Sequence, residues 1–118
     1  MCGILGMSID ATKDIGSFNQ FSPEFRHKVK GSISLLSHRG PDASGTEYFG
    51  DHGVFLGHTR LAIQDLSSAG EQPMVSKDKQ LAITFNGEIY NFPKLRDELK
   101  TLGYIFSSDT DTEVIMYL

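Results

Sequence analysis

Segments that favour β-strands alternate with segments that favour α-helices along this chain, and this alternation limits the possible folds more than any other feature. Short stretches that are apolar or alternate between apolar and polar residues are typical of strands. We expect strands at residues 2–9, 54–63 and 81–85, and a further short strand could form at 104–106. Asn86 and Gly87 directly follow the third stretch and indicate a tight turn. Strands joined by turns, with helices between them, indicate the α+β class.

Three helices are expected from their end signals. Each start carries an N-cap residue, and the first two helices end at a glycine. The expected helices run from Ser22 to Gly40, from Asn91 to Gly103, and onward from a capping box at Thr110–Glu113. Pro23 occupies the first helical position of the first helix, a place that favours proline. The sequence stops one or two turns into the third helix, which suggests a piece of a longer protein.

Length and composition exclude several classes of protein. A chain of 118 residues fits one small domain. Hydrophobic residues make up 39% and charged residues 22%, as in an ordinary soluble protein. A net charge of -4, without a basic run, argues against nucleic-acid binding. No apolar run approaches the roughly 20 residues that span a bilayer, and no secretory signal opens the chain, so we expect a cytoplasmic protein without a membrane partner.

The single cysteine stands at position 2, where it could become the first residue of the mature chain. Methionine aminopeptidases remove Met1 when the second residue is small, as Cys2 is. The product would carry a thiol and a free α-amino group, and such an amine is partly neutral near pH 7. A neutral amine can accept the thiol proton, which makes Cys2 a candidate nucleophile with its own base. A buried, inert cysteine is the alternative.

Two other segments carry residues suited to binding an amino acid or an amide. Arg60 lies in a strand-like stretch, opposite Leu61 and Ile63, where an arginine is usually solvated. The N–H donors of its guanidinium could instead bind both oxygens of a carboxylate. Asn86 and Gly87 could form the turn of a hairpin. Alternatively, the Asn86 side-chain amide and the Gly87 backbone N–H could point into the same cavity. Two such donors would stabilise the oxyanion that forms when a thiolate attacks an amide.

The acidic residues near the C-terminus and the histidines are ambiguous. Asp109 and Asp111 stand at a helix N-terminus, where acids are favoured in any case. The four histidines, at positions 27, 38, 52 and 58, lack the spacing of a metal site, and one cysteine excludes an internal disulfide. We therefore assign no metal.

Six motifs occur in an order that resembles the class II glutamine amidotransferases, the N-terminal nucleophile hydrolases with a terminal cysteine. The motifs are Cys2-Gly3-Ile4, His38-Arg39-Gly40-Pro41-Asp42, Arg60-Leu61-Ala62-Ile63-Gln64-Asp65, Gln72-Pro73, Asn86-Gly87-Glu88-Ile89-Tyr90-Asn91 and Asp109-Thr110-Asp111-Thr112-Glu113. The resemblance runs from Cys2 to Leu118 and is looser at residues 10–30. The third and fifth motifs are similar to those of glutamine-dependent asparagine synthetases. Gly-His-Thr-Arg and Asp-Thr-Asp-Thr-Glu-Val-Ile lean toward hexosephosphate aminotransferases, but that branch typically has Tyr at Pro41 and Trp at Leu61.

The resemblance implies a role for each motif residue. Cys2 would attack the side-chain amide of glutamine, with its own α-amine as the base, and water would hydrolyse the resulting γ-glutamyl thioester to glutamate. Asn86 and Gly87 would form the oxyanion hole, so the implied catalytic residues are these two and Cys2. The implied glutamine-binding residues are Arg60 at the α-carboxylate, Asp111 with Glu88 or its backbone at the α-ammonium, and Leu61, Ile63, Gln64, Asn86 and Gly87 along the pocket.

The resemblance also implies a fold and a partner. The family fold is an αββα sandwich of two antiparallel sheets, of which residues 1–118 would form the N-terminal portion, with Met1 removed. Glutamine hydrolysis would need no cofactor. Ammonia would pass to a C-terminal synthetase domain, missing from this chain, that activates aspartate with ATP and Mg. Because missing strands would leave apolar faces uncovered, we expect the isolated chain to be poorly stable or to self-associate as a homo-oligomer.

Two alternatives stay open at this point. The chain could supply ammonia to a sugar-phosphate or phosphoribosyl acceptor, which the next few hundred residues of the gene would show. It could also be a catalytically inactive amidotransferase-like module that binds glutamine or a protein partner without turnover. A glutaminase assay separates that second alternative from an enzyme.

Overall fold

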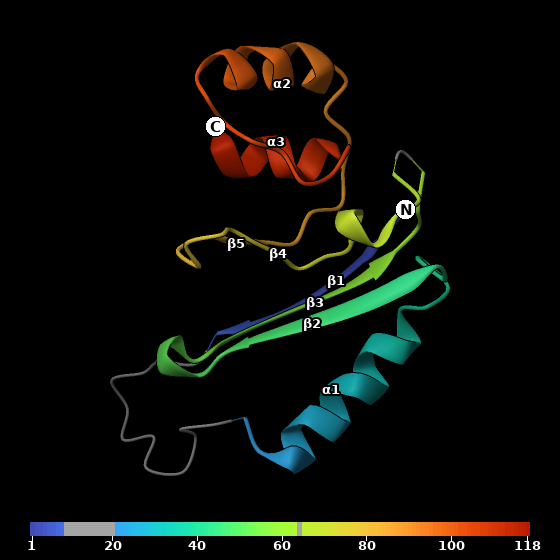
Figure 1. Ribbon diagram of the computed structural model, residues 1–118. Coiled ribbons are helices and arrows are strands. Elements are labelled where there is room, and N and C mark those ends of the chain that lie inside the picture. Colours follow the sequence, from blue (N-terminus) through green and yellow to red (C-terminus); the bar gives the residue numbers. More distant parts are fainter. Residues whose placement is uncertain (9–20, 64) are drawn as a thin grey trace.

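The computed structural model describes residues 1–8, 21–63 and 65–118 and arranges their helices and strands in successive layers (Figure 1). The strands are β1 (Gly3–Ser8), β2 (Ala43–Phe49), β3 (Val54–Arg60), β4 (Met74–Val75) and β5 (Ala82–Ile83). The helices are α1 (Pro23–Leu35), α2 (Phe92–Thr101) and α3 (Asp111–Tyr117), with 3₁₀ turns at Gly50–His52 and Ser68–Gly70. Helix α1 covers one face of an antiparallel sheet of order β1-β3-β2. The antiparallel β4–β5 hairpin lies on the other side of that sheet, and α2 and α3 lie beyond the hairpin. Antiparallel sheets with helices confirm the α+β class.

The central strand β3 sends alternate side chains to two different surroundings. Phe55 joins the core beneath α1, and the Thr59 hydroxyl donates a hydrogen bond to the Leu36 carbonyl at 3.2 Å. Since successive strand residues point to opposite faces, His58 and Arg60 project toward the hairpin side. Both are nevertheless buried, so neither face of this strand end is solvated.

Helix α1 forms where its capping signal predicts it. The Ser22 hydroxyl accepts a hydrogen bond from the Phe25 N–H at 3.1 Å, and Val29 and Ile33 are buried against the sheet. Gly57 permits this close packing, because a Cβ there would lie 2.6 Å from the Ile33 Cδ1. The predicted start of the first helix is therefore confirmed, but its predicted end at Gly40 was wrong, because α1 stops at Leu35 and the chain continues through turns.

Phe55 is the most buried side chain of this core, and we expect Phe55→Ala to lower the free energy of unfolding by about 3–5 kcal/mol. Phe55 is 1% exposed, and its ring lies 6.2 Å from that of Phe25 and 5.0 Å from that of Tyr48. Leu35, which is 77% exposed, supplies the control. Leu35→Ala should change the same quantity by less than about 0.5 kcal/mol. Urea unfolding measures both, and equal effects of the two substitutions would contradict this packing.

Helices α2 and α3 lie against each other (Figure 1), and the predicted capping box of α3 is only half formed. The Thr110 hydroxyl accepts a hydrogen bond from the Glu113 N–H at 3.4 Å. The Glu113 carboxylate does not return that bond. It accepts instead from the N–H groups of Ser107 and Ser108, at 2.8 and 2.7 Å. Glu113 thereby holds the loop that leads into α3.

The strand predictions were partly wrong, because some strands are shorter than predicted and one does not form. The first is confirmed as β1, although Ile9 lies outside the described residues. The second ends early, at Arg60, which is the last residue of β3 with a partner in the sheet, Ala43 of β2. The third shrinks to Ala82–Ile83. Residues 104–106 form no strand; aromatic rings of that stretch pack against Tyr117 of α3.

The tight turn predicted at Asn86 and Gly87 was also wrong. The hairpin turns earlier, where Ser76 N–H donates to the Leu81 carbonyl at 2.9 Å and Lys79 takes a positive φ of 59°. The stretch that holds Asn86 and Gly87 is irregular backbone with a bend at Gly87. The strand β2, with the weakly strand-forming Ala43-Ser44-Gly45 at its start, was missed because its pairing to β3 overrides local preference.

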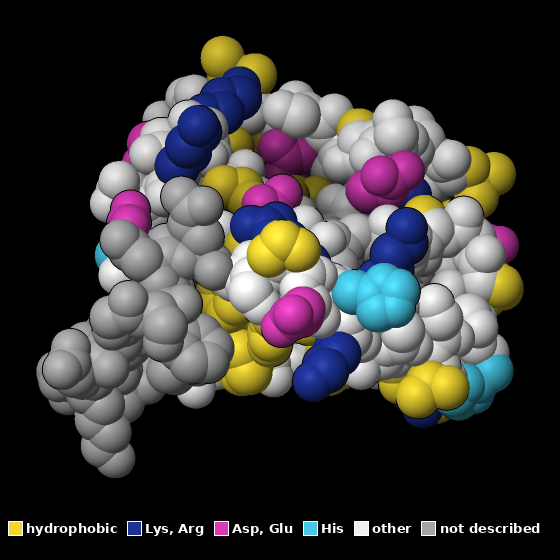
Figure 2. Space-filling model, turned by 90° about the horizontal axis from the view of Figure 1, so that it is seen from below, with side chains coloured by type: hydrophobic (Ala, Val, Ile, Leu, Met, Phe, Trp, Pro, Cys, Tyr) yellow, Lys and Arg dark blue, Asp and Glu magenta, His cyan; other side chains and the backbone are white. Residues whose placement is uncertain are grey.

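Charges of both signs are interspersed on the face of the molecule that carries α1 (Figure 2). Glu24 is exposed there, as are Arg26, Lys28 and Lys30.

In the described part of the chain, no helix is both long enough and apolar enough to cross a bilayer.

Candidate active site

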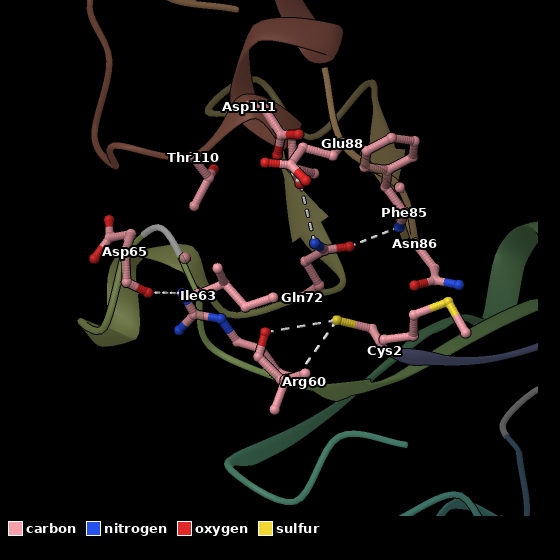
Figure 3. A pocket seen from close by; sticks show the side chains of 15 residues that line it. Cys2, Arg60, Ile63, Asp65, Gln72, Phe85, Asn86, Glu88, Thr110 and Asp111 are labelled. Atoms are coloured by element: carbon pink, nitrogen blue, oxygen red, sulfur yellow. Dashed lines mark hydrogen bonds between the residues drawn. The ribbon is translucent and has the colours of Figure 1, made fainter. Parts of the chain in front are cut away.

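A pocket of about 320 Å³ lies where the end of the three-stranded sheet, the segment after β5 and the start of α3 meet (Figure 3). Every predicted site residue that the structure describes lines this pocket. They are Cys2, Arg60, Leu61, Ile63, Asn86, Gly87, Glu88 and Asp111. The remaining one, Gln64, lies outside the described residues.

The thiol of Cys2 is held at the pocket wall by contacts on both sides of the residue. The Leu61 N–H donates to Cys2 Sγ at 3.4 Å. The Cys2 carbonyl accepts from Arg39 Nε at 3.0 Å, and the next N–H, of Gly3, donates to the Thr59 hydroxyl at 3.1 Å. A side chain at Gly3 would lie 2.6 Å from that hydroxyl, so the pair Cys2-Gly3 suits this close approach. These contacts direct the half-buried thiol into the pocket.

The arginine of β3 is buried and braced by backbone rather than solvated. Arg60 is 7% exposed, and its guanidinium donates to the carbonyls of Asp65 and Ser67, the latter at 2.7 Å. A Cβ at Gly70 would lie 2.3 Å from Arg60 Nη2, so only a glycine leaves room for the guanidinium. A guanidinium has five N–H donors, and these two bonds leave others for a ligand. The alternative of a solvated strand arginine is excluded.

Asp65 keeps the loop that braces Arg60 attached to the approach to α3. Its carboxylate accepts from the backbone N–H groups of Ser67 and Asp109, at 2.8 and 2.9 Å. Hydrogen bonds from the Ser67 side chain first, and then from these N–H groups, lower the pKa of Asp65 to about 2. The carboxylate is therefore ionised at neutral pH. Asp109 does not line the pocket; its carboxylate pairs with Arg96 at 2.9 Å.

Negative charge gathers at the side of the pocket formed by α3 and the segment after β5. Asp111 is buried, and its carboxylate accepts from the Ile89 N–H at 2.8 Å and contacts the Thr112 hydroxyl at 3.4 Å. Glu88 lies beside it, whereas Arg60 lies on the far side in this view (Figure 3). The separation of a cation from two carboxylates suits a zwitterion with one end of each sign. In the described ranges, no group of three His, Cys, Asp or Glu side chains could hold a metal ion.

Gln72, which lines the pocket, and His58, which lies behind it, were given no role by the sequence. The Gln72 Oε1 accepts from the Phe85 N–H at 2.6 Å, and His58 Nε2 lies 3.3 Å from the Phe85 carbonyl. A carbonyl can only accept, so His58 carries its proton on Nε2. Gln72 stood in a quoted motif, but no local pattern indicated that either residue would reach Phe85, which directly precedes Asn86.

The buried imidazole predicts how stability depends on pH. Burial above all, and the nearby Arg60, lower the pKa of His58 below its usual 6.5, against the opposing effect of the Phe85 hydrogen bond. The unfolded chain then binds the His58 proton more readily than the folded chain does. We expect the free energy of unfolding to fall as pH drops below about 6.5, and His58→Gln to weaken this dependence. Urea unfolding at about pH 7.5 and about pH 5.5 measures the effect. An unchanged slope in His58→Gln would contradict it.

Comparison with known proteins places these residues in a family. The sequence profile of the family described as "Glutamine amidotransferase domain" matches residues 1–118. "Asparagine synthetase [glutamine-hydrolyzing] 1" of Bacillus subtilis (strain 168) is 38% identical over 120 residues, covering 98% of this chain and 17% of that protein. "Probable asparagine synthetase [glutamine-hydrolyzing]" of Schizosaccharomyces pombe is 45% identical, covering 100% of this chain and 19% of that protein. The asparagine synthetase of Sandersonia aurantiaca is 42% identical, covering 100% and 20%. This chain therefore spans about a fifth of the length of these relatives.

Proposed function

This chain belongs to the glutamine amidotransferase domain family, class II, and we propose that it hydrolyses glutamine to glutamate and ammonia through a thioester at Cys2. One observation carries the proposal: the thiol, the Asn86–Gly87 segment, a braced arginine and a buried carboxylate line a single pocket. A nucleophile, paired donors and charges of both signs are the groups that an amidase specific for an amino acid requires.

The proposed reaction uses the two functional groups of the first residue. Once Met1 is removed, the Cys2 α-amine accepts the thiol proton while Sγ attacks the side-chain amide carbon of glutamine. The Asn86 amide and the Gly87 N–H stabilise the oxyanion of the tetrahedral intermediate. The C–N bond then breaks, the amine returns a proton to the departing ammonia, and a γ-glutamyl thioester remains. Water attacks the thioester, with the amine as base, and releases glutamate and the free thiol.

Binding of the substrate is proposed to rest on charge at both ends of the amino acid. Arg60 would pair with the α-carboxylate, since its guanidinium is already fixed by backbone carbonyls and loses little freedom on binding. Asp111, with Glu88 or its backbone, would hold the α-ammonium. Backbone groups from Leu61 to Gln64 would line the space between.

We also propose the family architecture and the destination of the ammonia. The layers of Figure 1 would belong to an αββα sandwich of the N-terminal nucleophile hydrolases, with residues 1–118 as its N-terminal portion. The relatives named above are all asparagine synthetases, which favours an asparagine-forming acceptor over a sugar-phosphate acceptor. That acceptor would be a C-terminal synthetase domain that activates aspartate with ATP and Mg.

A glutaminase assay tests the proposal. The chain is incubated with glutamine after mass spectrometry has confirmed that Cys2 is its first residue. Glutamate and ammonia should appear in equal amounts. Saturable glutamine binding without any turnover would overturn the proposal in favour of a catalytically inactive binding module.

A further inference from the structure

The segment that carries Asn86 and Gly87 is not held by a sheet. Strand β5 ends at Ile83, and the backbone beyond it is irregular until Phe92 begins α2. Backbone groups outside a ladder need other partners to fix their direction. An oxyanion hole depends on that direction, because its donors act only at the position that the oxyanion will occupy.

Both backbone polar groups of Phe85 are held by buried side chains from elsewhere in the fold. The Phe85 N–H donates to Gln72 Oε1 at 2.6 Å, and the Phe85 carbonyl accepts from His58 Nε2 at 3.3 Å. Gln72 is 8% exposed and His58 is 1% exposed. Two consecutive peptide planes are thus fixed, one on each side of the Phe85 Cα. The second of these planes contains the Asn86 N–H. Fixing this plane therefore orients the backbone from which the Asn86 side chain projects.

The two side chains connect this segment to the two halves of the pocket. His58 belongs to β3 of the three-stranded sheet, one residue from Thr59, whose hydroxyl bonds the Gly3 N–H beside Cys2. The other end of Gln72 donates from Nε2 to the Thr112 hydroxyl in the first turn of α3, at 3.1 Å. The thiol, the segment after β5 and the acidic end of the pocket are therefore joined through two side chains.

We propose that His58 and Gln72 are positioning residues, which hold the peptide groups of Phe85 and thereby aim Asn86 and Gly87 at the Cys2 thiol. This inference rests on the proposed function, since it names what orients the oxyanion hole of that reaction. Neither side chain takes part in the chemistry. Loss of either contact should move the donors by a fraction of an ångström to an ångström, which affects the transition state more than ground-state binding.

Steady-state kinetics of four variants of the full chain, with Met1 removed, test the inference. At similar volume, Gln72→Met removes both hydrogen bonds of the Gln72 amide and His58→Leu removes the bond to the Phe85 carbonyl. Both variants should lower kcat by about 100-fold while the KM for glutamine changes by less than about twofold. His58→Gln can still donate to the Phe85 carbonyl and should recover most of the loss. Thr84→Val is the matched control, because the buried Thr84 hydroxyl adjoins Phe85 and has no hydrogen-bond partner in the described structure. Its kcat should stay within about twofold of the parent.

Two further readouts separate positioning from a general loss of structure. Alkylation of Cys2 by iodoacetamide needs no oxyanion hole, so its rate should be unchanged in both disruptive variants. The Gly87 amide resonance should shift in Gln72→Met and His58→Leu but not in Thr84→Val. Should one disruptive variant fail to fold, the other decides the matter.

The outcomes distinguish this inference from the proposed function. An active parent with full kcat in folded Gln72→Met or His58→Leu would overturn the inference alone. A drop of the same size in Thr84→Val would also overturn it. If the parent shows no turnover, the proposed function fails, and an unshifted Gly87 resonance in His58→Leu would then overturn the positioning role as well.

Discussion

Replacing Cys2 with alanine is expected to lower kcat for glutamine hydrolysis by at least about 10⁴-fold. The thiol is the sole proposed nucleophile, and it lies at the pocket wall with the Leu61 N–H directed at its sulfur. Glutamine binding should survive, because the proposed charge contacts come from other residues. Calorimetry on Cys2→Ala measures the retained binding, and a coupled glutamate assay measures the lost rate.

A chain that keeps Met1 should lose activity to a similar degree although its thiol is intact. With Met1 in place, the nitrogen of Cys2 is an amide that cannot accept a proton, and Met1 itself lines the pocket. A tag that blocks removal of Met1 creates this form, and mass spectrometry verifies it. A tagged, uncleaved chain that works at the full rate would show that the base lies elsewhere.

The second large effect concerns recognition of the amino acid. Arg60→Ala and Asp111→Asn should each lower kcat/KM for glutamine by about 30- to 4000-fold, which corresponds to roughly 2–5 kcal/mol for the loss of one partner in a desolvated charge pair. The planar guanidinium of Arg60 supplies paired N–H donors as well as a positive charge. Arg60→Lys keeps only the charge and should therefore recover only part of the lost kcat/KM.

The chain offers a matched control for this test two residues away. Asp109 carries the same side chain as Asp111 on the same approach to α3, but it lies outside the pocket and pairs with Arg96. Asp109→Asn should leave kcat/KM within about twofold of the parent. Equal effects of Asp109→Asn and Asp111→Asn, or an unchanged kcat/KM in Arg60→Ala, would show that glutamine binds differently.

Local signals predicted the elements that local contacts hold. Ser22 and Pro23 marked the start of α1 correctly because an N-cap and a proline at the first position act on their own turn. The ordered motifs likewise predicted which residues meet in the pocket. The turn predicted at Asn86 and Gly87 was wrong because that segment is not part of a hairpin. Its preceding residue, Phe85, is held by side chains 13 and 27 positions away in the sequence.

The burial of Arg60 lay beyond local reasoning for a related reason. Alternation along β3 shows which residues share a face, but not that the loop at Asp65 and Ser67 covers the second face of the strand. The close approach that requires Gly70 is set by the same long-range packing. Such features depend on which segments meet in space, and a single sequence carries no direct record of that.

Trapping the covalent intermediate tests the central claim most directly. The chain, with Cys2 as its first residue, is mixed with glutamine, and the reaction is quenched rapidly in acid. The protein is then digested, and the mass of its N-terminal peptide is measured by mass spectrometry. The account predicts that this peptide gains the mass of one γ-glutamyl group, that hydroxylamine removes the added mass, and that Cys2→Ala never shows it. Glutamate released at full rate without any adduct at Cys2, or with the adduct on another residue, would contradict it.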